Sequence, residues 1–258
     1  MALELTSRAV IALSGPEARP FLQGLVTNDV GKAAKGHAIY AALLTPQGKI
    51  LFDFLIGESD GALLIDCRKA ARDGLVRRLT MYKLRAKFEI RVRDDLGVFI
   101  GEGTADPRLA ALGPRAVMAR IPAESGDAAY LSRRLDLGVP EGEDFGSDRM
   151  FALDAGLDEL HAVAFDKGCY VGQELTARMK HRGKDRKRLL PIATTDGKPL
   201  PGRDVPVTAG DVELGVIASV YGGRGFALLR LDRLEAAPAP LEAAGVRIAV
   251  TKPDWLFT

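Results

Sequence analysis

The stretch Phe165–Gly183, which reads FDKGCYVGQELTARMKHRG, decides how the rest of the chain is interpreted. It contains Cys169, one of only two cysteines, with Gly168 and Gly172 on either side. Glycine leaves the backbone free to turn tightly or to approach a ligand closely. Residues 173–180 are strong helix formers and predict a helix. The pattern indicates a turn that carries a cysteine just ahead of a helix N-terminus, where unpaired amide groups favour an anion such as a thiolate.

Two interpretations of Cys169 remain open on the chemistry alone. In the first, Lys167 and the helix N-terminus activate an exposed thiol that bonds transiently to a ligand or partner. In the second, Cys169 is a small buried thiol at a structural turn. A resident iron–sulfur cluster is not expected, because clusters usually need four thiolates or a mixed Cys/His set. Cys67, within an apolar run, is expected in the core.

The run Lys167–Glu174 (KGCYVGQE), followed by Thr176–Arg178 and His181–Gly183, resembles the signature of the YgfZ-type folate-binding proteins. These proteins are relatives of the glycine-cleavage T-protein, an aminomethyltransferase, and are linked to iron–sulfur cluster assembly. Phe21–Val30 (FLQGLVTNDV) and Thr45–Leu51 (TPQGKIL) resemble two further segments of the family. The resemblance covers nearly the whole chain and is weakest from about residue 101 to 147.

The resemblance implies a multi-domain α+β fold like that of the T-protein, with a C-terminal β-barrel, and a tetrahydrofolate site. Asp154 stands where folate-dependent relatives usually carry Glu, and it would accept the paired N–H donors of the pterin ring. The other implied ligand-binding residues are Asn28, Lys167, Gly168, Tyr170, Gly172, Gln173, Glu174 and Arg178. The acid pair of the aminomethyltransferase branch is incomplete, since the corresponding residues are Phe52 and Asp53. Asp53 is either a surviving functional carboxylate or, as we slightly prefer, an outward-facing strand residue.

Hydrophobic patterning predicts an α+β domain over 1–188, with an insertion near 45–120, and a small β-barrel over 189–258. The resemblance implies that the first of these domains binds folate. The TPQG segment predicts a hairpin between two apolar runs, and residues 68–84 predict an amphipathic helix. Residues 150–160 predict another helix, and residues 129–131 a short strand. These elements together would place Asp154 on a helix.

Composition restricts the location and partners of the chain. Two cysteines provide no disulfide framework, no apolar run reaches the length of a bilayer span, and no secretory signal is visible, so a cytoplasmic location is expected. No membrane partner is expected. Net charge is only +2, although Arg178–Arg188 has seven Lys/Arg and one acid. Few aromatic residues lie near this basic run, so direct RNA binding is not favoured.

The sequence therefore predicts a tetrahydrofolate-binding accessory protein that assembles or repairs iron–sulfur clusters in client enzymes, with Cys169 as its reactive thiol. By resemblance, the clients include enzymes that modify transfer RNA, and the partners are folate and iron–sulfur client or assembly proteins. No bound metal or cluster is predicted. The alternative is a folate-dependent aminomethyltransferase or demethylase, and whether the protein is an enzyme stays open.

Overall fold

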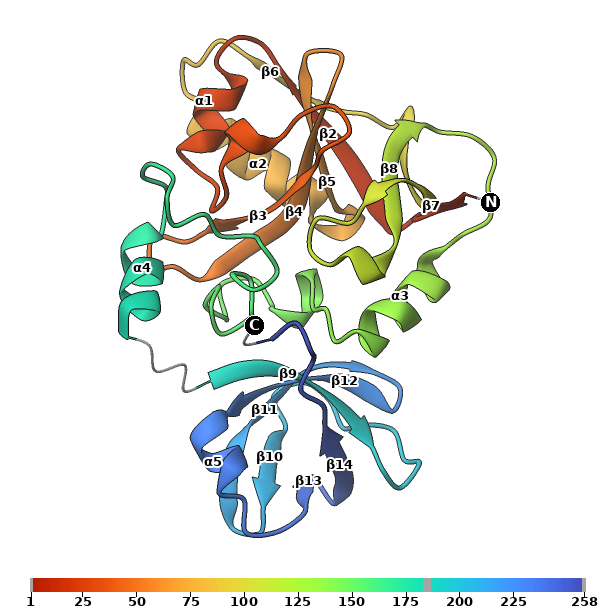
Figure 1. Ribbon diagram of the computed structural model, residues 1–258, viewed down its shortest axis with the longest axis vertical. Helices are drawn as coiled ribbons and strands as arrows, with labels where there is room; N and C mark the ends of the chain where they lie inside the picture. The colour runs from red at the N-terminus through yellow and green to blue at the C-terminus, as the bar shows by residue number, and fades with distance from the viewer. Residues whose placement is uncertain (1, 183–186, 257–258) are drawn as a thin grey trace.

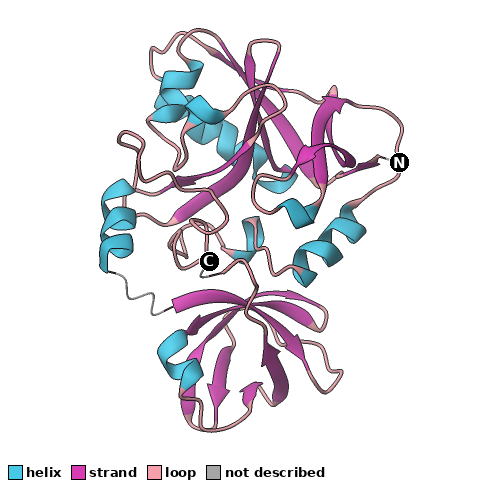
Figure 2. Cartoon of the chain, viewed as in Figure 1, coloured by secondary structure: helices cyan, strands magenta, loops and turns pink. Residues whose placement is uncertain are grey.

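The computed structural model describes residues 2–182 and 187–256. It has an upper lobe of two β-sheets with helices around them and a lower lobe that is a β-barrel (Figure 1). Loops and the C-terminal segment lie between the lobes (Figure 2). The mixture of helices and antiparallel sheets confirms the predicted α+β class.

A five-stranded antiparallel sheet of order β3-β4-β5-β2-β6 forms the centre of the upper lobe. Its strands are β2 (Arg8–Ser14), β3 (Ile39–Leu44), β4 (Ile50–Ser59), β5 (Ala62–Arg68) and β6 (Glu89–Val92). The predicted TPQG hairpin is confirmed, since β3 pairs with β4 across a turn in which Gly48 N donates to Thr45 O at 2.9 Å. Gly48 has φ +78°, a conformation that glycine adopts without strain.

Each face of this sheet covers a different hydrophobic core. Ile11 and Leu13 of β2 belong to a core that is closed by α1 (Ala18–Gln23) and α2 (Arg72–Lys83). Val10 and Ala12 point to the other face, where the core continues to the barrel. This alternation follows from the two-residue period of a strand. The core on the Val10 and Ala12 face extends into the barrel, so the two lobes share this core.

A smaller three-stranded sheet, with the order β1-β7-β8, lies beside the first. It consists of β1 (Leu3–Glu4), β7 (Leu96–Ala105) and β8 (Pro114–Ala119). The strand expected at residues 129–131 is wrong, because helix α3 spans Asp127–Asp136. Tyr130 and Arg134, four residues apart, are both buried on one face of α3, which is helical rather than strand spacing.

The helix expected at residues 150–160 is also wrong, since this segment forms successive turns. Gly156 within it has φ +73°, and a side chain there would meet the ring of Trp255 at 3.0 Å. His161 follows at φ +62°. The turns fold the segment between the two lobes, and Asp154 therefore does not lie on a helix.

The predicted C-terminal barrel is confirmed as a closed sheet of order β10-β11-β12-β9-β14-β13. Its strands are β9 (Lys187–Thr194), β10 (Pro206–Ala209), β11 (Val212–Tyr221), β12 (Arg224–Arg230), β13 (Leu241–Ala243) and β14 (Val246–Val250). The short helix α5 (Leu231–Glu235) follows β12. The domain boundary at residue 188 and the insertion near 45–120 stay predictions.

The remaining elements include four 3₁₀ turns, η1 (Val30–Lys32), η2 (Lys69–Ala71), η3 (Ala110–Leu112) and η4 (Gly142–Asp144). Helix α4 (Gln173–Arg182) confirms the helix predicted after the cysteine. Part of the basic run, residues 183–186, lies outside the described residues. Within the described chain, the helices lack the length and apolar character that crossing a bilayer would need.

Candidate functional site

Cys169 lies exposed on the segment 164–172, which we call the thiol loop, immediately before α4. The start of the loop is fixed by a hydrogen bond from Ala164 N to Thr27 O at 3.0 Å. The other cysteine, Cys67, is buried in β5, where burial raises its pKa to about 12. Of the two thiols, only that of Cys169 is therefore available to a partner.

Lys167 fastens the thiol loop to the end of α1. Its ammonium donates hydrogen bonds to Gln23 O and Val26 O, both at 2.6 Å, and it lies 5.0 Å from the centre of the Tyr170 ring. Burial lowers the pKa of Lys167 to about 8, while Asp29 opposes the shift. We expected Lys167 to favour the thiolate, but its described hydrogen bonds hold the backbone.

Gly172 fixes the other end of the loop against the TPQG hairpin. It has φ +85°, and a Cβ placed on it would lie 2.6 Å from Thr45 O and 3.1 Å from Gly48 Cα. Gly168 differs, because a Cβ there would meet nothing within 4 Å. The two glycines that flank the cysteine therefore serve different purposes, and only Gly172 is required for packing.

The first turn of α4 forms hydrogen bonds with the thiol loop. Gln173 accepts a hydrogen bond from Tyr170 N at 3.3 Å, and the buried Thr176 hydroxyl donates to Gly172 O at 3.1 Å. Glu174 and Arg178 point to solvent and form an ion pair of 2.7 Å. Of the predicted ligand-binding residues, Tyr170 and Gln173 shape the loop, whereas Glu174 and Arg178 lie on its exposed side.

A cavity of about 280 Å³ opens beside the thiol loop. Its lining residues are Ala164, Phe165, Tyr170, Gln173, Ala177, Lys180 and His181. Phe165 is 43% exposed, and the Lys180 ammonium lies 5.4 Å from its ring centre and 2.9 Å from Asp158 Oδ2. The loop that carries the exposed thiol therefore also contributes Phe165 and Tyr170 to a cavity that Lys180 lines.

Asn28 lies next to Thr27 at the start of the thiol loop, and Asp154 lies on the turn segment. Asn28 is buried, and its amide donates to Tyr40 O and His161 O, both at 2.7 Å. Asp154 accepts a hydrogen bond from Leu189 N at 2.8 Å through its backbone, where the turn segment meets β9. The linings of the three described cavities do not include Asp154. Of the predicted folate ligands, Tyr170 and Gln173 line the cavity beside the thiol loop, and the folate site stays a prediction.

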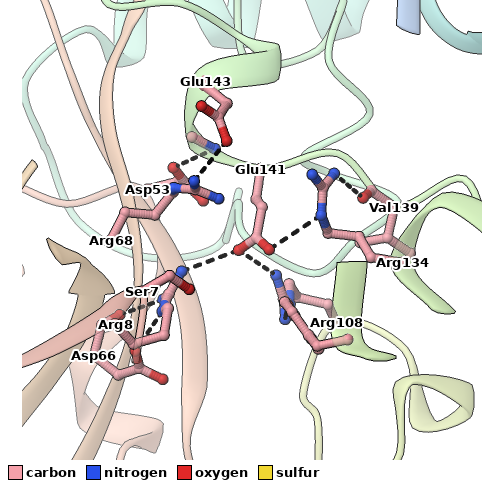
Figure 3. Close-up of polar contacts among 12 residues, drawn as sticks. Ser7, Arg8, Asp53, Asp66, Arg68, Arg108, Arg134, Val139, Glu141 and Glu143 are labelled. Carbon is pink, nitrogen blue, oxygen red and sulfur yellow. Dashed lines mark hydrogen bonds and ion pairs between the residues drawn. The ribbon is translucent and has the colours of Figure 1, made fainter. Parts of the chain in front are cut away.

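A buried network of charges, which the sequence did not predict, links the central sheet to α3 and to the loop that follows α3 (Figure 3). The carboxylate of Glu141 is surrounded by Arg8 at 3.0 Å, Arg134 at 3.3 Å and Arg108 at 3.4 Å. Burial alone would raise the pKa of Glu141, but the guanidinium groups outweigh it and hold the pKa far below its ordinary value. Charged residues are rarely buried unless paired, so their separate places in the sequence gave no signal.

Asp53 belongs to the edge of this network. Its two oxygens accept hydrogen bonds from Tyr40 OH at 3.0 Å and from Gly142 N at 2.9 Å, and the residue is only 6% exposed. Burial, followed by the charge of Glu141, raises the pKa of Asp53. Our preference for an outward-facing Asp53 is therefore wrong, because residue 53 faces the core between the lobes.

A second cavity, of about 260 Å³, lies between the two sheets of the upper lobe. Its walls include Leu55, Leu64 and Val117, and its lining also contains Asp66 and Arg115. The side chain of Arg115 is 5% exposed and donates from Nε to Asp66 at 2.7 Å. Its Nη1 has no hydrogen-bond partner within the described part of the chain. A buried donor of this kind could bind an oxygen of a ligand.

Several known proteins are similar to this chain in sequence. The family description "CAF17, C-terminal beta-barrel domain" matches residues 186–258. The iron–sulfur cluster assembly factors IBA57 of Mus musculus and Homo sapiens are each 32% identical, over 97% of this chain and 84% of theirs. A Neurospora crassa IBA57 homolog is 34% identical over 73% of this chain, which spans about half (52%) of that relative.

These relatives are named as mitochondrial proteins, which contradicts the expected cytoplasmic location. The low cysteine content separates reducing from oxidising compartments, but it does not distinguish one reducing compartment from another. Among solved structures, the aminomethyltransferase T of the glycine cleavage system from Bartonella henselae matches 99% of this chain and 86% of its own, with a TM-score of 0.75 and 14% identity. This likeness confirms the T-protein-like fold.

Proposed function

The chain belongs to the family of iron–sulfur cluster assembly factors that includes IBA57, and from this premise we propose that it helps to assemble or repair iron–sulfur clusters in client enzymes. The observation that carries the proposal is the exposed thiol of Cys169 on a loop held by Lys167 and Gly172. A fixed loop presents the sulfur in one place without internal rearrangement. Enzymes that modify transfer RNA are among the clients we propose.

The chemistry required of Cys169 is that of one transient ligand. The described residues contain no group of three or more His, Cys, Asp or Glu side chains placed to hold a metal ion. The cluster would therefore be cargo, and a partner protein would supply its remaining ligands. Cys169 would lose its proton to water, and its thiolate would bind one iron in place of a ligand that leaves. The cavity beside Phe165 would receive an apolar side chain of that partner.

The test compares two cysteine variants in cells that lack the chromosomal copy. Cys169→Ser is expected to lower the activities of several iron–sulfur enzymes as far as deletion does, whereas Cys67→Ser, a change at a buried position, should restore them if the protein accumulates. Normal activities with Cys169→Ser would remove the thiol from the function. Normal activities in the deletion strain would remove cluster assembly altogether.

We also propose tetrahydrofolate, a carrier of one-carbon units on a reduced pterin ring, as the ligand of the upper-lobe cavity. The apolar walls of Leu55, Leu64 and Val117 suit a ring. The Nη1 of Arg115, which has no hydrogen-bond partner in the described chain and lies 3.8 Å from Asp106 Oδ2, suits a carbonyl or carboxylate oxygen. Lys35, exposed among the lining residues, would face the anionic glutamate tail. The residues of this cavity thus fit folate better than Asp154 does.

Calorimetric titration with tetrahydrofolate distinguishes the two locations. Ala105→Trp, which places a bulky ring on an exposed part of the cavity lining, should abolish binding, and Asp154→Ala should leave it unchanged. Loss of binding in Asp154→Ala alone would return the site to the turn segment. An absence of binding to the wild-type protein would leave cluster assembly without this cofactor.

Aminomethyl transfer has weaker support from the same geometry. Both oxygens of Asp53 are already hydrogen-bonded within the protein, and Phe52 occupies the place of the second acid. A general base needs to reach the proton that it removes from the substrate. We therefore do not extend the proposal to this activity.

A further inference from the structure

The C-terminal end of α2 displays an apolar tip within a ring of basic side chains. Met81 is 57% exposed and Leu84 is 88% exposed, among the most exposed large apolar residues of the described chain. Met81 lies in the last turn of α2, and Leu84 directly follows the last residue of the helix. We call this surface the basic tip; its basic members are Arg77, Arg78, Lys83, Arg85 and Lys87.

The backbone conformation at Leu84 makes a leucine at this exposed position energetically unfavourable. Leu84 follows the last residue of α2 at φ +47° and ψ −110°, a positive-φ conformation that favours glycine. A non-glycine residue there costs on the order of 1 kcal/mol. A leucine that is both strained and almost fully exposed contributes little to folding, so its side chain calls for another explanation.

Basic residues dominate the sequence around the tip. From residue 77 to 87 the sequence has five basic residues and no acid. Lys83 lies over the Phe88 ring at 5.4 Å, and Glu17 accepts from the backbone N–H of Lys87 at 2.5 Å. The side chains of Arg85 and Lys87 are exposed and have no ion pair within the described part of the chain. Positive charge at the negative end of the helix dipole is also favourable.

From these observations we propose that the basic tip docks the protein on an anionic lipid surface. Aliphatic side chains that project from a convex end enter the interfacial layer of a bilayer, and the surrounding Lys and Arg meet its phosphates. The linings of the three described cavities do not include the residues of the tip. The tip is in the upper lobe, on the side away from the barrel (Figure 1). The expectation of no membrane partner rested on the lack of an apolar run long enough to span a bilayer, which does not bear on docking at a membrane surface.

Vesicle sedimentation with the full chain tests the proposal. The protein should bind vesicles of equal phosphatidylglycerol and phosphatidylcholine, should not bind phosphatidylcholine alone, and should be released by high salt. Each basic residue near the surface contributes about fivefold to binding, so Arg85→Glu/Lys87→Glu should weaken it at least ~25-fold. Lys32→Glu/Lys69→Glu, which changes net charge equally at exposed positions elsewhere, should weaken it far less.

Leu84→Trp separates insertion from adsorption. The one native tryptophan, Trp255, is 9% exposed, so a blue shift of emission on vesicle binding would report the new residue. Unchanged emission in the bound state would overturn insertion. An equal loss of vesicle binding in both double variants would contradict the basic tip as the binding site. Failure of the wild type to bind anionic vesicles would contradict it as well. Binding of poly-glutamate without binding of vesicles would replace lipid by an acidic protein and also overturn the proposal. Circular dichroism of each variant would serve as the control for folding.

Discussion

Gly172 packs against the carbonyl oxygen of Thr45 so closely that a Cβ on Gly172 would lie 2.6 Å from that oxygen. The contact joins the thiol loop to the β3–β4 hairpin through two residues that are more than 120 positions apart in the sequence. The position of Cys169 is therefore determined by the central sheet as well as by its own turn.

The first prediction concerns the two glycines beside the cysteine. Gly172→Ala should lower the free energy of unfolding by about 2 kcal/mol, because it adds a clash and a strained φ of +85°. Gly168→Ala, whose Cβ meets nothing within 4 Å, should change it by less than ~0.5 kcal/mol. Urea denaturation of both variants measures the difference. Equal effects would mean that the close approach to Thr45 is not required.

Thiol reactivity provides a second prediction. In the native protein, a disulfide reagent such as Ellman's should modify one thiol rapidly, and in urea it should modify two. Cys169 is exposed, whereas Cys67 is buried and its pKa is raised to about 12, so little of it is thiolate. Cys169→Ser should remove the fast phase and Cys67→Ser should leave it intact. A fast phase that survives in Cys169→Ser would contradict the assignment.

The buried network predicts a large effect of one uncharged substitution. Glu141→Gln removes the charge that Arg8, Arg108 and Arg134 share, and it should cost about 3–5 kcal/mol of stability. Glu143→Gln, at an exposed ion pair with Arg68, should cost less than ~1 kcal/mol. Thermal and urea unfolding provide both values. A cost for Glu141→Gln no greater than that of the control would mean that the arginines find other partners.

The carboxyl pair Asp158 and Glu159 predicts a dependence of stability on pH. Burial, with a contribution from the neighbouring Asp158, raises the pKa of Glu159 to about 7. A raised pKa in the folded state favours the protonated form, so this stabilisation is complete below the ordinary value of about 4.3 and is lost as pH rises through about 7. Unfolding at about pH 5 and about pH 8.5 should differ by roughly 1–2 kcal/mol more in the wild type than in Glu159→Gln. The exposed Glu213→Gln is the control, and an unchanged difference in Glu159→Gln would refute the assignment.

Local patterns in the sequence were enough to predict several elements. The hairpin at residues 45–48, the helix after Cys169 and the C-terminal barrel all follow from turn residues and apolar periodicity within short windows. The same patterns did not predict α3, because its helix is favoured by the burial of Tyr130 and Arg134, a tertiary effect. They also predicted a helix at 150–160 that packing between the lobes replaces by turns.

By itself, the sequence determined the family resemblance and the position of an unusual thiol between two glycines, because both depend on contiguous residues. Only the tertiary structure decided what surrounds that thiol. Lys167 bonds to the end of α1, Asp53 turns inward, and Arg8 meets Glu141 across 133 positions of sequence. A charged side chain is stable in the interior only where a counter-charge meets it. For Glu141 the counter-charge of Arg8 comes from a distant part of the chain, so their meeting is a property of the fold rather than of any local pattern.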